Sequence, residues 1–84
     1  MKPIRFTAHA LWKLGIAQEM GIEIDENSVA EAVRGPREVL LGYSGRSIAQ
    51  VILDEAHLLR VVYEENDEIV LITLYPGRRQ RYES

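Results

Sequence analysis

The chain has 84 residues, a length that fits one domain built around a single core, and we expect one domain over residues 1–84. Hydrophobic residues make up 46% of the sequence and charged residues 27%, which is typical of globular proteins and argues against disorder. The absence of cysteine excludes disulfides and cysteine-based sites, and two histidines are too few for a zinc site, so no metal or other cofactor is expected.

The net charge is −3, and an acidic chain is not the usual composition of a nucleic-acid binder. Any RNA-binding hypothesis must therefore rest on local clusters of positive charge. No apolar run reaches the roughly 20 residues of a membrane-spanning helix. Pro3, Arg5 and His9 also interrupt the amino terminus where a signal peptide would be apolar. These features predict a cytoplasmic protein.

The first predicted element is a short strand in "PIRFTAH", where Ile4 and Phe6 share one face and Pro3 indicates a position at the sheet edge. From about Thr7 the period becomes helical, and apolar or small residues recur every three to four positions to Gly21. Thr7 is a suitable N-cap for this helix, and Gly21 is a suitable stop.

A second helix is predicted in "DENSVAEAVRGP". Asp25 or Asn27 can cap it, and Gly35-Pro36 ends it. Its apolar stripe is short, so the helix requires packing against other elements to be stable.

The remainder of the chain predicts four strands, in "REVLLGY", "SIAQVILD", "LLRVVYEE" and "EIVLITLYP", which are joined by short turns. In the third, Leu59, Val61 and Tyr63 share one face, while Arg60 and its alternating neighbours share the other. The order strand, two helices and four strands predicts an α+β fold, in which both helices pack on one face of an antiparallel meander.

The first candidate site is the pair His9 and Lys13, one helical turn apart. Histidine can transfer protons and lysine can hold a phosphate group. The alternative is that His9 packs near the helix start and Lys13 is solvated.

Two arginines form the second candidate. Arg46 follows a glycine in a turn, whereas Arg60 interrupts an apolar strand and therefore requires a partner for its charge. Glu38 or Glu64 on a neighbouring strand could be that partner. The alternative is a substrate phosphate, which arginine binds in a bidentate manner.

The third candidate is the carboxyl-terminal run "YPGRRQRY". Arginines interleaved with aromatic rings are typical of single-stranded RNA binding, and here the set is Tyr75, Arg78, Arg79, Arg81 and Tyr82. The alternatives are a solvated terminus, or arginines that pair with the acidic run "EENDE".

Five motifs together resemble a family of small uncharacterised bacterial and archaeal proteins: an early "HA" opening a helix, "EMGI", "GR" in a hairpin, "LLRVVYEE" and "TLYPGRRQRY". That family is similar to the RelE and BrnT toxins, the ribonuclease components of type II toxin–antitoxin systems. The resemblance implies a RelE-like sandwich, a possible antitoxin partner and mRNA cleavage without a metal ion. It implies catalytic roles for His9, Arg60, Arg79 and Tyr82, and RNA contacts from Lys13, Arg46, Arg78 and Arg81.

Two functional hypotheses follow. In the first, the protein is a ribonuclease toxin in which Arg60 and Arg79 hold phosphate and His9 or Tyr82 moves protons. In the second, it is a non-catalytic interaction module whose exposed sheet face, with Val62, Thr73 and Tyr75, forms a homodimer or holds another protein. The location of His9, Arg46, Arg60 and the carboxyl-terminal run relative to one another discriminates between them.

Overall fold

A computed structural model describes residues 1–36 and 38–83 of the chain. Its elements, in chain order, are β1 (Ile4–Phe6), α1 (Ala8–Glu19), α2 (Glu26–Arg34), β2 (Glu38–Leu41), the 3-10 turn η1 (Tyr43–Gly45), β3 (Ser47–Ile52), β4 (His57–Glu65), β5 (Ile69–Arg78) and α3 (Arg79–Tyr82). The predicted order of one strand, two helices and four strands is confirmed. The structure adds η1 and α3, neither of which was predicted.

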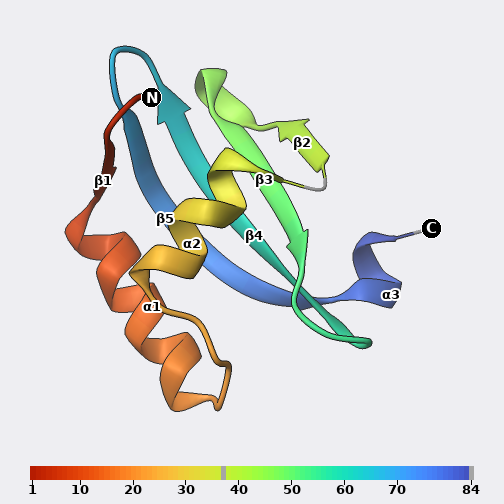
Figure 1. The fold of residues 1–84 in the computed structure, drawn as a ribbon. Coiled ribbons are helices and arrows are strands. Elements are labelled where there is room, and N and C mark those ends of the chain that lie inside the picture. The colour runs from red at the N-terminus through yellow and green to blue at the C-terminus, as the bar shows by residue number, and fades with distance from the viewer. Residues whose placement is uncertain (37, 84) are drawn as a thin grey trace.

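The five strands form one sheet in the order β1-β5-β4-β3-β2 (Figure 1). β2 to β5 make the predicted antiparallel meander. β1 lies at the edge, as Pro3 indicated, but it pairs in parallel with β5, so the sheet as a whole is mixed. The α+β class, with helices packed on the sheet, is therefore confirmed.

The core lies between the sheet and helices α1 and α2, which cover the same face (Figure 1). Leu59, Val61 and Tyr63 of β4 point into this core, as their alternation predicted. The helices contribute small and branched side chains, chiefly Ala10, Leu14, Ala17, Val29 and Val33. Among the described residues, no helix combines the length and the apolar character needed to cross a bilayer.

Local chemistry explains where the two helices begin and end. The Thr7 hydroxyl accepts a hydrogen bond from the Ala10 amide at the start of α1. After α1, Gly21 adopts a positive φ of 89°, and two reverse amide bonds close a Schellman motif. At α2, Asp25 and Ser28 form a reciprocal capping box, which resolves the choice between Asp25 and Asn27 in favour of Asp25.

A β-bulge interrupts the pairing of β4 with β5. Val62 pairs with Thr73, but Tyr63 pairs with Leu71, which leaves Ile72 as the extra residue. The Thr7 hydroxyl donates to the Leu71 and Ile72 carbonyl oxygens at this point. Thr7 therefore fixes the start of α1 to the bulge, and this determines where the first helical turn lies against β5.

Candidate functional site

The face of the sheet opposite α1 and α2, here called the open face, carries Arg60 at its centre. Arg60 pairs in register with Gln50 of β3 and Tyr75 of β5, so these three side chains lie side by side on one face. Gln50 is 2% exposed, although no helix of the core covers it. The open face is therefore partly shielded from solvent at its centre.

Helix α3 covers one end of the open face. The Tyr82 ring lies against Gly77, where an added Cβ would overlap the ring. The guanidinium carbon of Arg60 is 4.3 Å from the Tyr82 ring centroid and 5.9 Å from the Tyr75 centroid. Arg60 is thus held by two aromatic rings, in cation–π contacts that keep its charge.

Arg60 has no carboxylate partner among residues 1–36 and 38–83, and its Nε is buried without a hydrogen bond there. The sequence-based suggestion that Glu38 or Glu64 pairs with it is wrong. Glu64 accepts instead from Nε of Arg46 at 3.0 Å, because the β2–β3 hairpin brings Arg46 to that end of the open face. Glu38 lies 3.5 Å from the Gln50 amide nitrogen.

His9 lies in the first turn of α1 and is exposed. Its Nε2 is 3.1 Å from the Thr73 hydroxyl, and its ring stacks at a tilt against Trp12 with 5.5 Å between centroids. Thr73 and Tyr75 are alternate residues of β5 and share the open face. His9 therefore lies at the margin of the surface that contains Arg60. Lys13 follows one helical turn later, half-buried, and no described residue forms an ion pair with it.

The three arginines of the carboxyl-terminal run diverge. Arg78 pairs with His57 and faces the helix side of the sheet, not the open face. Arg79 donates to Glu83 at 2.9 Å and to the carbonyl oxygens of Asp54 and Glu55, so it fixes α3 to the β3–β4 loop. Arg81 is exposed on α3.

The predicted pairing of this run with "EENDE" is not found among the described residues. That acidic turn contacts the amino terminus instead, through Lys2 with Glu65 and Arg5 with Glu68. The structure therefore gathers Arg60, Tyr82, Tyr75, Thr73 and His9 on or beside one face. It separates Arg78 and Arg79 from them, and it neutralises Arg46 with Glu64.

The structure also contains an Asp–His pair that the sequence analysis did not predict. Nδ1 of His57 is 3.1 Å from Oδ1 of Asp54, which also accepts hydrogen bonds from the Ala56 and His57 amides. The amide of Ala56 makes the largest contribution that lowers the pKa of Asp54, and it outweighs the opposing desolvation of the carboxyl group. The available signal was Asp54 three residues before His57 in "DEAH", a spacing typical of an aspartate-capped turn.

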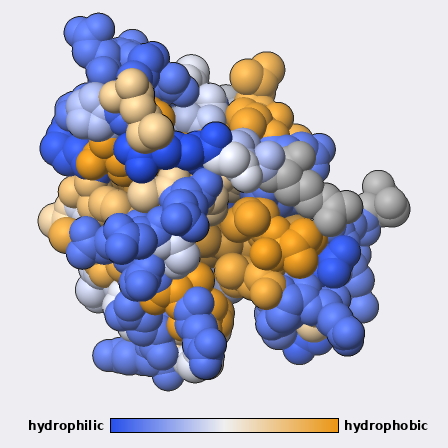
Figure 2. Space-filling model, viewed as in Figure 1, coloured by the Kyte–Doolittle hydropathy of each residue, from blue (hydrophilic) through white to orange (hydrophobic). Residues whose placement is uncertain are grey.

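Exposed apolar side chains occur at and after β2. Leu41 is 93% exposed and Tyr43 is 94% exposed, beside Val39 at 51%. On the side of the molecule seen in Figure 2, apolar patches alternate with hydrophilic ones. β2 is an edge strand, so these side chains border an unpaired strand edge.

No protein-family model, curated protein or solved structure matches this chain. The candidate surface is therefore judged by its own contacts. In the part of the chain that the structure describes, no three His, Asp or Glu side chains form a cluster that could hold a metal ion. The chemistry available on the open face is that of a guanidinium, two phenols, a hydroxyl and an imidazole.

Proposed function

We propose that the open face binds single-stranded RNA and cleaves it by acid–base catalysis without a metal ion, as a toxin of the RelE type would. The observation that carries the proposal is Arg60, a guanidinium stacked on Tyr82 and close to Tyr75, with no carboxylate partner in the described chain. A cation kept unneutralised on a partly buried surface suits a phosphate group. Aromatic rings beside it suit unstacked bases.

We assign the chemical roles from the kinds of side chain that the open face carries. Cleavage through the 2′-hydroxyl needs a base, a cation for the charge on phosphorus and an acid for the leaving oxygen. In the proposal Arg60 is the cation, while His9 and Tyr82 transfer the protons. Arg79 holds α3, and therefore Tyr82, in place through its contacts with the β3–β4 loop. In a toxin–antitoxin pair, the antitoxin would cover this same face.

The first test is binding of a fluorescently labelled single-stranded RNA, followed by anisotropy. We expect Arg60→Gln to weaken binding by about tenfold or more, since charge-assisted contacts contribute about 1.5–3 kcal/mol. Arg34→Gln is the matched control, because it removes the same charge from exposed Arg34 on α2, away from the open face. Equal losses in the two variants would indicate unspecific charge attraction and would overturn the proposal.

The second test is cleavage. Induced expression in a bacterial host keeps ribosomes available, and we expect growth arrest with fragmented mRNA from the wild type. His9→Gln should abolish fragmentation while RNA binding persists, because the imidazole is assigned to proton transfer. Intact mRNA and normal growth with folded wild-type protein would limit the function to binding.

A second candidate function is a homodimer formed through β2, and the exposed Leu41 and Tyr43 beside this edge strand favour it. Sedimentation of the wild type against a Leu41→Ser/Tyr43→Ser variant tests this candidate. A concentration-dependent dimer that the variant abolishes would support it. A monomer at every concentration would contradict it.

A further inference from the structure

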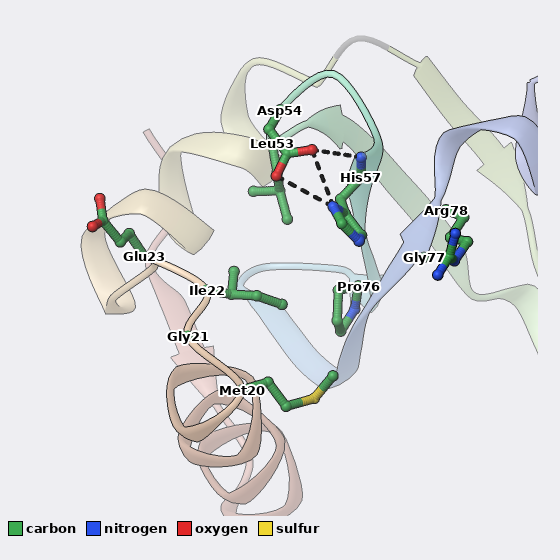
Figure 3. Close-up of a pocket in the computed structure, with 10 residues that line it drawn as sticks. All are labelled: Met20, Gly21, Ile22, Glu23, Leu53, Asp54, His57, Pro76, Gly77 and Arg78. Carbon is green, nitrogen blue, oxygen red and sulfur yellow. Dashed lines mark hydrogen bonds and ion pairs between the residues drawn. The ribbon is translucent and has the colours of Figure 1, made fainter.

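A groove of about 750 Å³ opens on the helix side of the sheet, beyond the carboxyl-terminal end of α1. Its walls are the α1–α2 loop with Met20 and Ile22, the β3–β4 loop with Leu53 and Asp54, and the paired ends of β4 and β5 (Figure 3). His57 and Arg78 are register partners on these two strand ends. The groove therefore lies on the opposite face of the sheet from Arg60 and is separate from the RNA surface proposed above.

His57 is oriented by Asp54. Oδ1 and Oδ2 of Asp54 lie 3.1 Å and 3.3 Å from Nδ1 of His57, and two backbone amides hold Oδ1 in position. The same amides keep the pKa of Asp54 low, so an ionised carboxylate faces Nδ1. Nδ1 must then carry a proton, and Nε2 remains for a ligand. In Figure 3 the ring extends from Asp54 toward Pro76 and the middle of the groove.

Arg78 supplies the second polar group. Register partners on antiparallel strands point to the same face, so its side chain leaves β5 next to that of His57. No residue in the described ranges 1–36 and 38–83 forms an ion pair with Arg78, which is exposed. Glu23, the other acidic residue of the lining, turns its carboxylate away from the groove (Figure 3). The charge of Arg78 is therefore not neutralised at this site.

The remaining lining is apolar. Met20 and Ile22 approach from the α1–α2 loop, and Pro76 and Leu53 lie across from them (Figure 3). Gly21 adopts a positive φ of 89°, which turns the chain after α1 and presents Ile22 to the groove. A volume of this size is in the range of small-molecule sites, which combine apolar walls with a few convergent polar groups.

We propose that this groove binds a small phosphate monoester with a flat apolar or aromatic body, such as a nucleoside monophosphate. The phosphate lies between Nε2 of His57 and the guanidinium of Arg78, and the planar body lies against Met20, Ile22 and Pro76. The negative charge of a bound phosphate favours a second proton on the ring, whose Nε2–H then donates to a phosphate oxygen while Asp54 balances the charge. The guanidinium adds a second set of charge-assisted hydrogen bonds.

The test is an NMR titration of the isotope-labelled wild-type protein with adenosine 5′-monophosphate, inorganic phosphate and adenosine. We expect saturable shifts of the His57 imidazole and of the Ile22 and Leu53 amides with the monophosphate. Inorganic phosphate should shift the same His57 signals more weakly, and the shifts caused by adenosine should not reach saturation. Equal binding of adenosine and the monophosphate would exclude a phosphate subsite.

Variants assign the contacts. We expect His57→Gln and Arg78→Gln each to weaken the binding of the monophosphate by about tenfold or more. Arg34→Gln should leave the affinity for the monophosphate unchanged. Asp54→Asn is a second variant that tests the role of His57, because it removes the negative charge beside the imidazole. The loop should stay ordered, since the amide oxygen of asparagine can still accept hydrogen bonds from the Ala56 and His57 amides. Melting curves of all four variants show that the folded protein is compared in each case. Equal weakening by Arg34→Gln would overturn the proposal.

The outcome is separable from that of the RNA proposal. Arg60→Gln removes the cation of the open face and should leave the monophosphate titration unchanged. Shifts that map to Arg60 and Tyr82 instead of His57 and Ile22 would overturn the groove as the site. RNA binding could then still be measured on its own.

Discussion

Arg60 shows how a charged residue can occupy an otherwise apolar strand. Its guanidinium stacks on Tyr82 at 4.3 Å, so the apolar contact of the ring replaces part of the lost hydration without removing the charge. Two buried polar atoms at this position, Oε1 of Gln50 and Nε of Arg60, have no hydrogen-bond partner among the described residues. Such unpaired groups cost folding energy, which is consistent with a surface that gains hydrogen bonds from a ligand.

Gly77 is the position that allows Tyr82 to approach the sheet. In Gly77→Ala the new Cβ would overlap the Tyr82 ring, so we expect the ring to leave Arg60 and the protein to lose about 1–3 kcal/mol of stability. Ring-current shifts on the Arg60 side chain and a denaturant melt measure the two effects.

Gly15→Ala is the control for that substitution. An added Cβ at Gly15 meets no atom within 4 Å, and Gly15 lies inside α1, so this change should stabilise by about 0.5–1 kcal/mol. An unchanged Arg60 spectrum in Gly77→Ala would show that the cation–π contact does not depend on this glycine.

Asp54 makes stability depend on pH in the acidic range. Its pKa is lowered in the folded protein, chiefly by the Ala56 amide, so below about pH 4 the unfolded chain takes up the proton more readily. The stabilisation is present above about pH 4 and is lost as the pH falls through the folded pKa. We expect the melting temperature of Asp54→Asn to fall less steeply below pH 4 than that of the wild type.

Asp67→Asn is the matched control for the acid melt, because Asp67 makes no side-chain hydrogen bond to a described residue. Its melting temperature should follow the wild-type dependence on pH. Parallel curves of melting temperature against pH for Asp54→Asn and the wild type would mean that Asp54, in the turn before β4, does not contribute to the pH dependence of stability.

Strand β5 is in contact with helices on both faces of the sheet. It pairs with β1 and β4, packs against α1 on one side and continues directly into α3. Its bulge at Ile72 and the Thr7 contacts set the position of α1, which in turn places His9 beside Thr73. The geometry of the candidate site is therefore fixed by β5 more than by any other strand.

Leu74 tests the importance of β5 for stability. It is fully buried in the helix-facing core, so Leu74→Ala should cost about 2–5 kcal/mol in a urea melt. Leu41→Ala removes the same atoms from a side chain that is 93% exposed in the single chain. At a protein concentration where the chain is monomeric, it should change stability by less than about 0.5 kcal/mol. Comparable losses in the two variants would contradict the assignment of the core.

The net charge of −3 is compatible with the proposed RNA binding only if the basic groups are unevenly distributed. Pairing with acidic residues removes Arg5, Arg46 and Lys2 from the available set. The open face retains Arg60, with His9 at its margin and Arg81 on α3. In the proposed complex with RNA, stacking on Tyr82 and Tyr75 would therefore supply much of the affinity.

The dependence of RNA binding on salt measures this distribution. Neutralisation of two to three phosphates on a single strand predicts a slope of log K against log salt of about −1.4 to −2.1. Tyr75→Ala should weaken binding by about 1–3 kcal/mol with no change in that slope, because stacking releases no counterions. Anisotropy titrations over a range of salt concentrations give both values, and a much steeper slope would indicate a wider basic surface.

The α+β class, the order of the main elements and the two faces of β4 could be predicted from the sequence. These properties follow from local chemistry, since the alternation of Leu59, Val61 and Tyr63, the caps Thr7 and Asp25, and the stop at Gly21 act within a few residues. The three-dimensional fold was needed to establish the parallel pairing of β1 with β5, the return of α3 onto Gly77 and the stacking of Arg60 on Tyr82. It also separated Arg78 from Arg60 and placed His57 in a groove with Ile22. Such contacts join residues far apart in the chain, and neither periodicity nor turn chemistry specifies which of them meet.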